Sequence, residues 1–87
     1  MRLRCSVPYC RRTYGNPDGY AEWLCGEHYR LADPSLRMRK TAYMRKLRAA
    51  ERRCDPASIE RAERLLHIAN FVWRKIKRQA IERALGI

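Results

Sequence analysis

The sequence predicts a small, mostly α-helical fold, in which an N-terminal finger with a short hairpin precedes two antiparallel helices. Three observations carry this prediction. Three cysteines and a histidine are closely spaced in the first third of the chain. Two Asp-Pro pairs, Asp33-Pro34 and Asp55-Pro56, resemble helix starts, with an N-cap acceptor before a proline. Each pair is followed by a long segment with apolar residues at helical spacing.

The spacing of the cysteines and the histidine is typical of a metal site. The chain reads C-x4-C, fourteen residues, then C-x2-H, which selects Cys5, Cys10, Cys25 and His28. A tight loop can present two thiolates, and C-x2-H at a helix start places two more ligands on one face. A chain of 87 residues has a small core that usually needs a staple. We therefore expect a structural Zn²⁺ in a treble-clef-like finger over residues 1–32.

The rest of the cysteine and histidine inventory leaves alternatives for the fourth ligand. Cys54 falls on an apolar stripe, where a buried small hydrophobic residue is the ordinary expectation, and His67 lies far from the other ligands in sequence. His28 is preferred because its spacing requires no long-range contact. Three cysteines and a histidine leave no open coordination position, and no carboxylate pair or free histidine lies nearby, so no enzyme activity is expected.

Inside the finger, the sequence predicts a hairpin. Residues 12–14 could form a short strand, the run Gly-Asn-Pro-Asp-Gly at 15–19 is a dense turn signal, and residues 20–24 alternate as a return strand would. Cys25 to His28 would then open a short helical turn.

The remainder, residues 33–87, is expected to be a basic helical hairpin with helices over about 34–53 and 56–85, forming one compact unit with the finger. The apolar stripe of the first helix comprises Leu36, Tyr43, Leu47, Ala50 and Cys54. The second helix carries a heptad seam of Ile59, Ala62, Leu66, Ala69, Trp73, Ile76 and Ala80, widened by Leu65, Ile68 and Val72. Because the second helix is the longer one, part of its seam could pack on another copy as a homodimer.

The charge lies mainly on the first of these helices. The chain has 20 Lys plus Arg against 9 Asp plus Glu, a formal net charge of +11, and residues 35–53 alone hold eight basic residues and one acidic. An arginine stripe at helical steps comprises Arg37, Arg45, Arg48 and Arg52, flanked by Arg39 and Lys46. Arg11 and Arg12 could extend it. Such a density of arginine suggests a polyanionic partner.

The sequence therefore predicts a non-enzymatic nucleic-acid-binding accessory or regulatory protein, with DNA favoured over RNA. The alternative is a protein-interaction module that offers its basic face to an acidic partner. No apolar run approaches the roughly 20 residues of a membrane span, and no signal-peptide pattern opens the chain, so a cytoplasmic location without a membrane partner is expected.

The finger also resembles a known module. C-x4-C followed by L-C-x2-H-Y-x-R is similar to a small zinc-binding module of bacteriophage and prophage proteins, including the front of some phage HNH-type endonucleases. The matching residues are Cys5, Cys10, Leu24, Cys25, His28, Tyr29 and Arg30, within about 28 of 87 residues. The resemblance implies that the bound ion is zinc. For the alternative function, the protein-interaction module, it implies a phage-encoded protein that modulates a host protein. An HNH catalytic part needs further histidines and an asparagine, whereas only His67 and Asn70 follow here, so nuclease activity is not expected.

Overall fold

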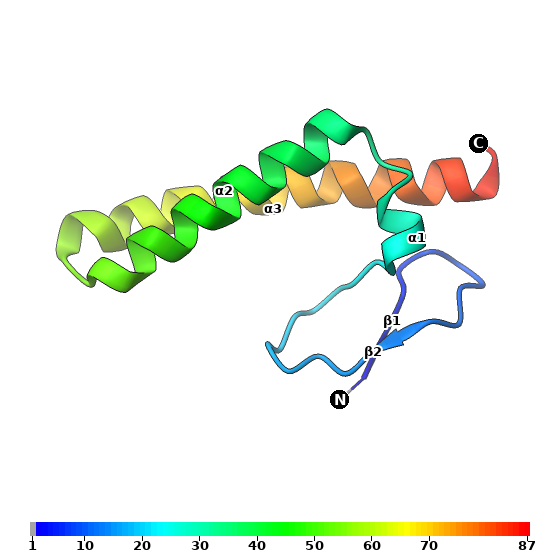
Figure 1. The fold of residues 1–87 in the computed structure, drawn as a ribbon, viewed down its shortest axis with the longest axis horizontal. Helices are drawn as coiled ribbons and strands as arrows, with labels where there is room; N and C mark the ends of the chain where they lie inside the picture. Colours follow the sequence, from blue (N-terminus) through cyan, green and yellow to red (C-terminus); the bar gives the residue numbers. More distant parts are fainter. Residues whose placement is uncertain (1) are drawn as a thin grey trace. The chain divides into compact units, whose positions relative to one another are not determined.

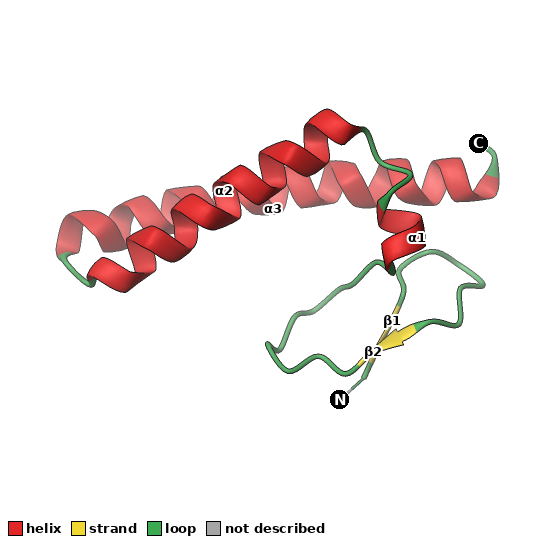
Figure 2. Cartoon of the chain, in the orientation of Figure 1, coloured by secondary structure: helices red, strands yellow, loops and turns green. Residues whose placement is uncertain are grey.

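A computed structural model describes residues 2–87 of the chain. Its elements are, in order, strands β1 (Leu3–Arg4) and β2 (Thr13–Tyr14) and helices α1 (Gly26–Tyr29), α2 (Pro34–Arg53) and α3 (Pro56–Leu85) (Figure 1, Figure 2). The prediction of a small, mostly helical chain with a two-stranded hairpin is confirmed. No helix within residues 2–87 has the combination of length and apolar character that crossing a membrane requires.

The chain forms two compact units. We call residues 2–33 together with Ile76–Ile87 the finger unit, and Pro34–Lys75 the hairpin unit. The sequence placed all of α3 with the helical part, because an uninterrupted helical pattern gives no sign that its last turns belong to another unit. The contacts instead group those turns with the finger.

In the hairpin unit, α2 lies beside the first part of α3 and runs in the opposite direction (Figure 1). The core between them consists of Leu47, Ala50 and Leu65, with Tyr43, Met44 and Ala62 packed against it. Asp55 begins α3 as its N-cap, because its Oδ1 accepts a hydrogen bond from the N–H of Ser58 at 2.7 Å. That bond also holds the pKa of the Asp55 carboxyl below its ordinary value.

The buried face of α3 lies to one side of the predicted seam. Leu65 is 8% exposed, whereas Leu66 and Ile59, both assigned to the seam, are 48% and 52% exposed. The buried positions of the helix are Ser58, Leu65, Ala69, Val72, Ile76 and Ala80. Apolar residues cover a broad arc of α3, so their periodicity alone does not show which of them lie at the centre of the buried face. Small residues at 58, 62 and 69 mark the face where a neighbouring backbone can approach closely.

The expectation that Cys54 is buried is wrong. Its side chain is exposed, and its backbone has φ 58°, in the left-handed region. α2 ends at Arg53, so Cys54 is the first residue beyond the helix and no longer follows the apolar stripe. Its thiol donates to the Glu51 carbonyl at 3.5 Å, which ties it to the last turn of α2.

The hairpin of the finger unit uses a different pair of strands from the one expected. β1 pairs antiparallel with β2, with Leu3 opposite Tyr14, so the C-x4-C segment connects the two strands. Residues 20–24 form no strand. The Asn16 side chain bonds both the N–H and the carbonyl of Tyr20, at 2.7 and 2.9 Å, and the Trp23 carbonyl accepts from the N–H of Ser6 at 2.8 Å. These bonds occupy the backbone groups that a ladder with β2 would need.

Candidate metal centre

The four expected ligands lie in or beside short elements of the finger unit. Cys5 directly follows β1, and Cys10 lies at the far end of the loop that leads to β2. Cys25 is the N-cap residue of α1, and His28 is the third residue of that helix, so both ligands lie within one helical turn. The N–H of Cys5 donates to the Arg12 carbonyl at 3.0 Å, and the N–H of Cys25 lies 3.3 Å from Cys5 Sγ. These bonds join the hairpin to the start of α1.

The ligand atoms converge on one point. One ligand atom from each of Cys5, Cys10, Cys25 and His28 lies within 4.8 Å of all the others. His28 Nδ1 is 3.5 Å from Cys5 Sγ and 3.2 Å from Cys25 Sγ, and the sulfurs of Cys10 and Cys25 are 3.9 Å apart. A tetrahedral ion with bonds of ~2.3 Å to sulfur and ~2.0 Å to nitrogen separates its ligand atoms by roughly 3.5–3.8 Å. The cluster therefore fits one tetrahedral metal ion.

Hydrogen bonds favour the thiolate form of Cys25. Burial by itself opposes ionisation of this thiol, but the hydrogen bonds from the Arg12 guanidinium and the His28 backbone outweigh burial and lower the pKa of Cys25 to about 6. Burial raises the pKa of Cys5, which lacks a cationic partner of that kind. Arg12 Nη1 lies 3.5 Å from Cys25 Sγ and also pairs with the Glu27 carboxylate. Arg12 thus bridges a ligand and a surface acid.

The donor set is closed. Three thiolates and one imidazole complete a tetrahedron, so a metal ion held here has no coordination position left for water or substrate. Cys5 and Cys25 are buried, at 6% and 1% exposure, and Cys10 and His28 are partly buried. Such a set stabilises a fold, because an ion that binds only the folded state adds its binding free energy to folding.

The last turns of α3 complete the finger unit. The Gln79 carboxamide forms two hydrogen bonds with Asp33, one to its backbone N–H at 2.9 Å and one to Oδ2 at 3.1 Å. Arg83 donates to the Leu31 carbonyl at 2.6 Å and to Asp33 Oδ1 at 2.9 Å, and Lys77 pairs with Glu22. The Arg83 bond, followed by that from Gln79, holds the pKa of Asp33 below its ordinary value.

The two competing ligand candidates lie outside the cluster. Cys54 and His67 both belong to the hairpin unit, and both side chains are exposed. The cluster is complete with His28 as its fourth member.

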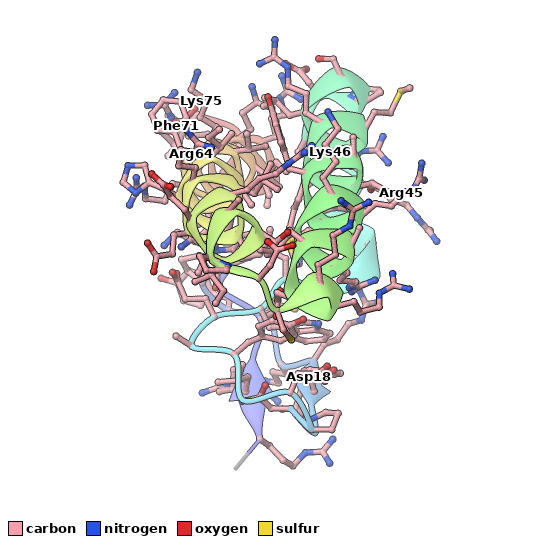
Figure 3. All side chains as sticks on the ribbon, turned by 90° about the vertical axis from the view of Figure 1, so that its left-hand side faces the viewer. Asp18, Arg45, Lys46, Arg64, Phe71 and Lys75 are labelled. Carbon is pink, nitrogen blue, oxygen red and sulfur yellow. The ribbon has the colours of Figure 1, made fainter. Side chains whose placement is uncertain are left out.

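The basic residues of α2 mostly face solvent. Arg39, Arg45, Lys46, Arg48 and Arg52 are exposed, whereas Arg37 is partly buried. Figure 3 shows Arg45 projecting from α2 on the side turned away from α3. Lys46 Nζ lies 5.8 Å from the centre of the Tyr43 ring, in cation–π contact. In the finger unit, Arg11 is exposed, while Arg12 is engaged at the metal cluster.

Sequence reasoning missed the contacts of Arg12 and Gln79 and the exposed position of Tyr9. No spacing rule links Arg12 to Cys25, or Gln79 to Asp33, because both contacts join distant parts of the chain. Tyr9 is 94% exposed with φ 69°. The proline before it could have been a signal, because proline at the second position of a turn often precedes a residue with positive φ.

No protein-family model matches the chain, and neither the curated proteins nor the solved structures give a match.

Proposed function

We propose that this protein is a non-enzymatic nucleic-acid-binding accessory or regulatory protein, in which a structural zinc ion stabilises the finger and α2 contacts phosphates. Zinc is the ion for which three thiolates and one imidazole in a closed tetrahedron are most typical. The resemblance to the phage module favours the same ion, and it makes a phage or prophage origin part of this proposal.

One observation carries the nucleic-acid proposal. Arg45, Arg48 and Arg52 are exposed on one face of α2, and none of them forms an ion pair with another described residue. From Arg45 to Arg52 there are eight residues, or about 10 Å of helix, a length over which duplex DNA carries about six phosphate charges. Guanidinium groups at this spacing can each fork onto a phosphate.

Positive charge is crowded along this helix. Burial lowers the pKa of Lys40, and the nearby positive charge of Arg48 lowers it further. Within α2 the only acidic residue is Glu51. Repulsion of this kind is relieved when a polyanion binds, so it supports a partner with closely spaced negative charges.

The test is binding of the zinc-loaded protein to duplex DNA, single-stranded DNA and RNA at several salt concentrations. We expect affinity to fall with salt, with a log–log slope of about 0.9 per phosphate contact on duplex DNA. Replacing both Arg45 and Arg48 with alanine should then lower that slope by about 1.8. DNA should bind more tightly than RNA.

Arg78→Ala is the matched control, because Arg78 is an exposed arginine that is already paired with Glu82. This variant should leave the slope unchanged. The proposal is wrong if no nucleic acid binds at ~50 mM salt, or if binding at ~0.5 M salt is as tight as at low salt.

A second candidate is a protein-interaction module for an acidic partner. The observation that favours it is the set of large apolar side chains exposed on α3, which includes Ile59, Leu66 and Phe71 at 52%, 48% and 51% exposure. Lys75 Nζ lies over the Phe71 ring, 4.8 Å from the ring centre, and Figure 3 shows the two side chains together on α3. Apolar residues beside cations suit an acidic protein surface.

Pull-down with and without nuclease treatment separates the two candidates. Capture of a protein that survives nuclease treatment and is lost in Phe71→Ala favours the interaction module. Capture that nuclease abolishes favours nucleic acid.

A further inference from the structure

Tyr9 is the most exposed large hydrophobic side chain of the finger unit, at 94%. It lies inside the C-x4-C loop, directly before the ligand Cys10. No ring contact or hydrogen bond joins its side chain to any residue that the structure describes. Packing therefore gives no reason for an aromatic residue at this position.

The backbone conformation at Tyr9 does not favour an aromatic residue at this position either. The N–H of Cys10 donates to the Val7 carbonyl at 3.2 Å, which closes a four-residue turn with Pro8 in second place and Tyr9 in third. Tyr9 has φ 69°, the value that the third position of a type II turn requires. Glycine or asparagine is the usual choice there, because a positive φ strains a bulky side chain. The turn alone would be more stable without the ring.

The loop that presents Tyr9 is fixed at both ends. Cys5 and Cys10 belong to the metal cluster, and the Val7–Cys10 hydrogen bond holds the two residues between them. A loop held in this way loses little backbone freedom when its residues bind a ligand. The ring is therefore presented to solvent in advance.

The arginines close to Tyr9 in the sequence favour an anionic ligand. The first acidic residue of the chain is Asp18, whereas four arginines precede it. Arg4 and Arg11 are exposed, and neither pairs with any described residue. Arg11 follows Tyr9 by two residues, which limits the separation of their Cα atoms to about 7 Å. An aromatic ring and a guanidinium this close can reach the base and the phosphate of one nucleotide.

We propose that Tyr9 is a base-stacking residue and that its ring takes an unpaired nucleobase, while Arg11 contacts the adjoining phosphate. This inference rests on the proposed nucleic-acid function and extends it from phosphate contact to bases. Aromatic side chains stack on any base, so the preference is for single-stranded segments without a fixed sequence.

The experiment measures binding of the full-length, zinc-loaded protein to a short single strand, to the same strand made of abasic nucleotides, and to a duplex of equal length. Tyr9→Gly should weaken binding to the intact strand about 5- to 150-fold, the range that loss of one base stack produces. Tyr9→Trp should retain binding. The wild type should bind the abasic strand as weakly as Tyr9→Gly does, and the salt slope should not change.

Zinc binding by Tyr9→Gly and strand binding by a second tyrosine variant serve as controls. Glycine suits the positive φ at this position, so Tyr9→Gly should hold zinc as the wild type does, and its binding loss cannot arise from unfolding. Tyr20→Gly changes a 47% exposed tyrosine of the same unit outside this loop and should bind the strand as the wild type does.

If Tyr9→Gly binds all three probes like the wild type while the Arg45 and Arg48 variant binds weakly, the stacking inference is overturned and the proposed function stands. If the wild type binds none of the probes, both are overturned. Equal loss on the intact and the abasic strand would also refute stacking, because it would show a contact that needs no base.

Discussion

Arg12 stabilises charge at the metal cluster. Three thiolates around a divalent ion would leave one net negative charge, next to the buried side chains of Cys5 and Cys25. Arg12 donates to Cys25 Sγ and pairs with Glu27, so a cation held by a surface acid faces the thiolates. Residues that orient and neutralise metal ligands in this way usually contribute to metal affinity as much as to shape.

Replacing Arg12 with alanine should weaken metal binding about 10- to 100-fold. Without the guanidinium, the pKa of Cys25 should rise from about 6 towards its ordinary value, so at pH 7 the metal must displace a proton that wild-type Cys25 has already lost. Calorimetry in two buffers of different ionisation enthalpy should therefore show about one more proton released per ion than in the wild type. Unchanged proton release would contradict this role. Arg12→Lys keeps the charge and should give an intermediate result.

Cys54 lies in the left-handed region just after α2, where its side chain strains the backbone. Cys54→Gly should raise the free energy of unfolding by about 0.5–1 kcal/mol, because relief of strain exceeds the added freedom of the unfolded chain. Chemical denaturation measures this change. Cys54→Ser, which keeps a side chain at the same φ, should stay within about 0.5 kcal/mol of the wild type. Both variants should still bind one metal ion per chain.

At the residue scale, the ligand cluster was predictable because its members pair within short loops. Spacing rules describe Cys5 with Cys10 and Cys25 with His28, and one turn of backbone brings each pair together. The expectation for Cys54 failed because the apolar stripe was extended one residue past the expected helix end at 53, where the backbone of Cys54 is in the left-handed region and no longer follows the helix. Arg12 pairs with Glu27 across the finger, a contact without a local signature.

At the scale of elements, the packing of α3 buries one of two neighbouring leucines and exposes the other. Leu65 belongs to the core with Leu47 and Ala50, while Leu66 is half exposed. Leu65→Ala should lower the free energy of unfolding by about 2–5 kcal/mol, because it leaves a cavity between α2 and α3. Leu66→Ala, the same change one residue later, should cost less than about 1 kcal/mol. Thermal or urea unfolding of the two variants gives the comparison, and equal losses would mean that Leu66 is buried against a partner chain.

Helix starts are well encoded here, and strand pairing is not. α2 and α3 begin at Pro34 and Pro56, each directly after an aspartate, because proline suits the first helical position. β1 consists of two residues, too few to produce an alternating pattern. Residues 20–24 do alternate, but side-chain bonds from Asn16 and the carbonyl of Trp23 direct that segment elsewhere.

At the scale of the whole molecule, the finger unit is built from both ends of the chain. Ile76 and Ala80, each 0% exposed, belong to this unit, and Gln79 and Arg83 bond to Asp33. Sequence could not reveal this, since the helical pattern of α3 continues without a break. We therefore expect metal binding to depend on residues some fifty positions away from the last ligand in the sequence.

Ile76→Ala should lower the free energy of unfolding by about 2–5 kcal/mol and also speed the loss of metal to a chelator. The metal readout matters, because a residue that belonged only to the hairpin unit would not change it. Ile87→Ala is the control in the same unit, since Ile87 is 86% exposed. Chelator-driven release at wild-type speed from the Ile76 variant would refute the dependence.

The insertion of residues 34–75 within the finger unit has a consequence for the order of folding. On a nascent chain, the four ligands leave the ribosome well before Gln79 and Arg83, so the finger cannot be finished when its ligands first meet metal. Pairing of α2 with α3 brings Lys40 beside Trp73, with Nζ 5.4 Å from the ring centre. Residues 34–75 then form a closed hairpin, so bringing residues 33 and 76 together costs less conformational entropy than closing a long flexible loop would. The hairpin should thus form early, and the finger unit should be completed only afterwards, when the last turns of α3 dock on residues 2–33.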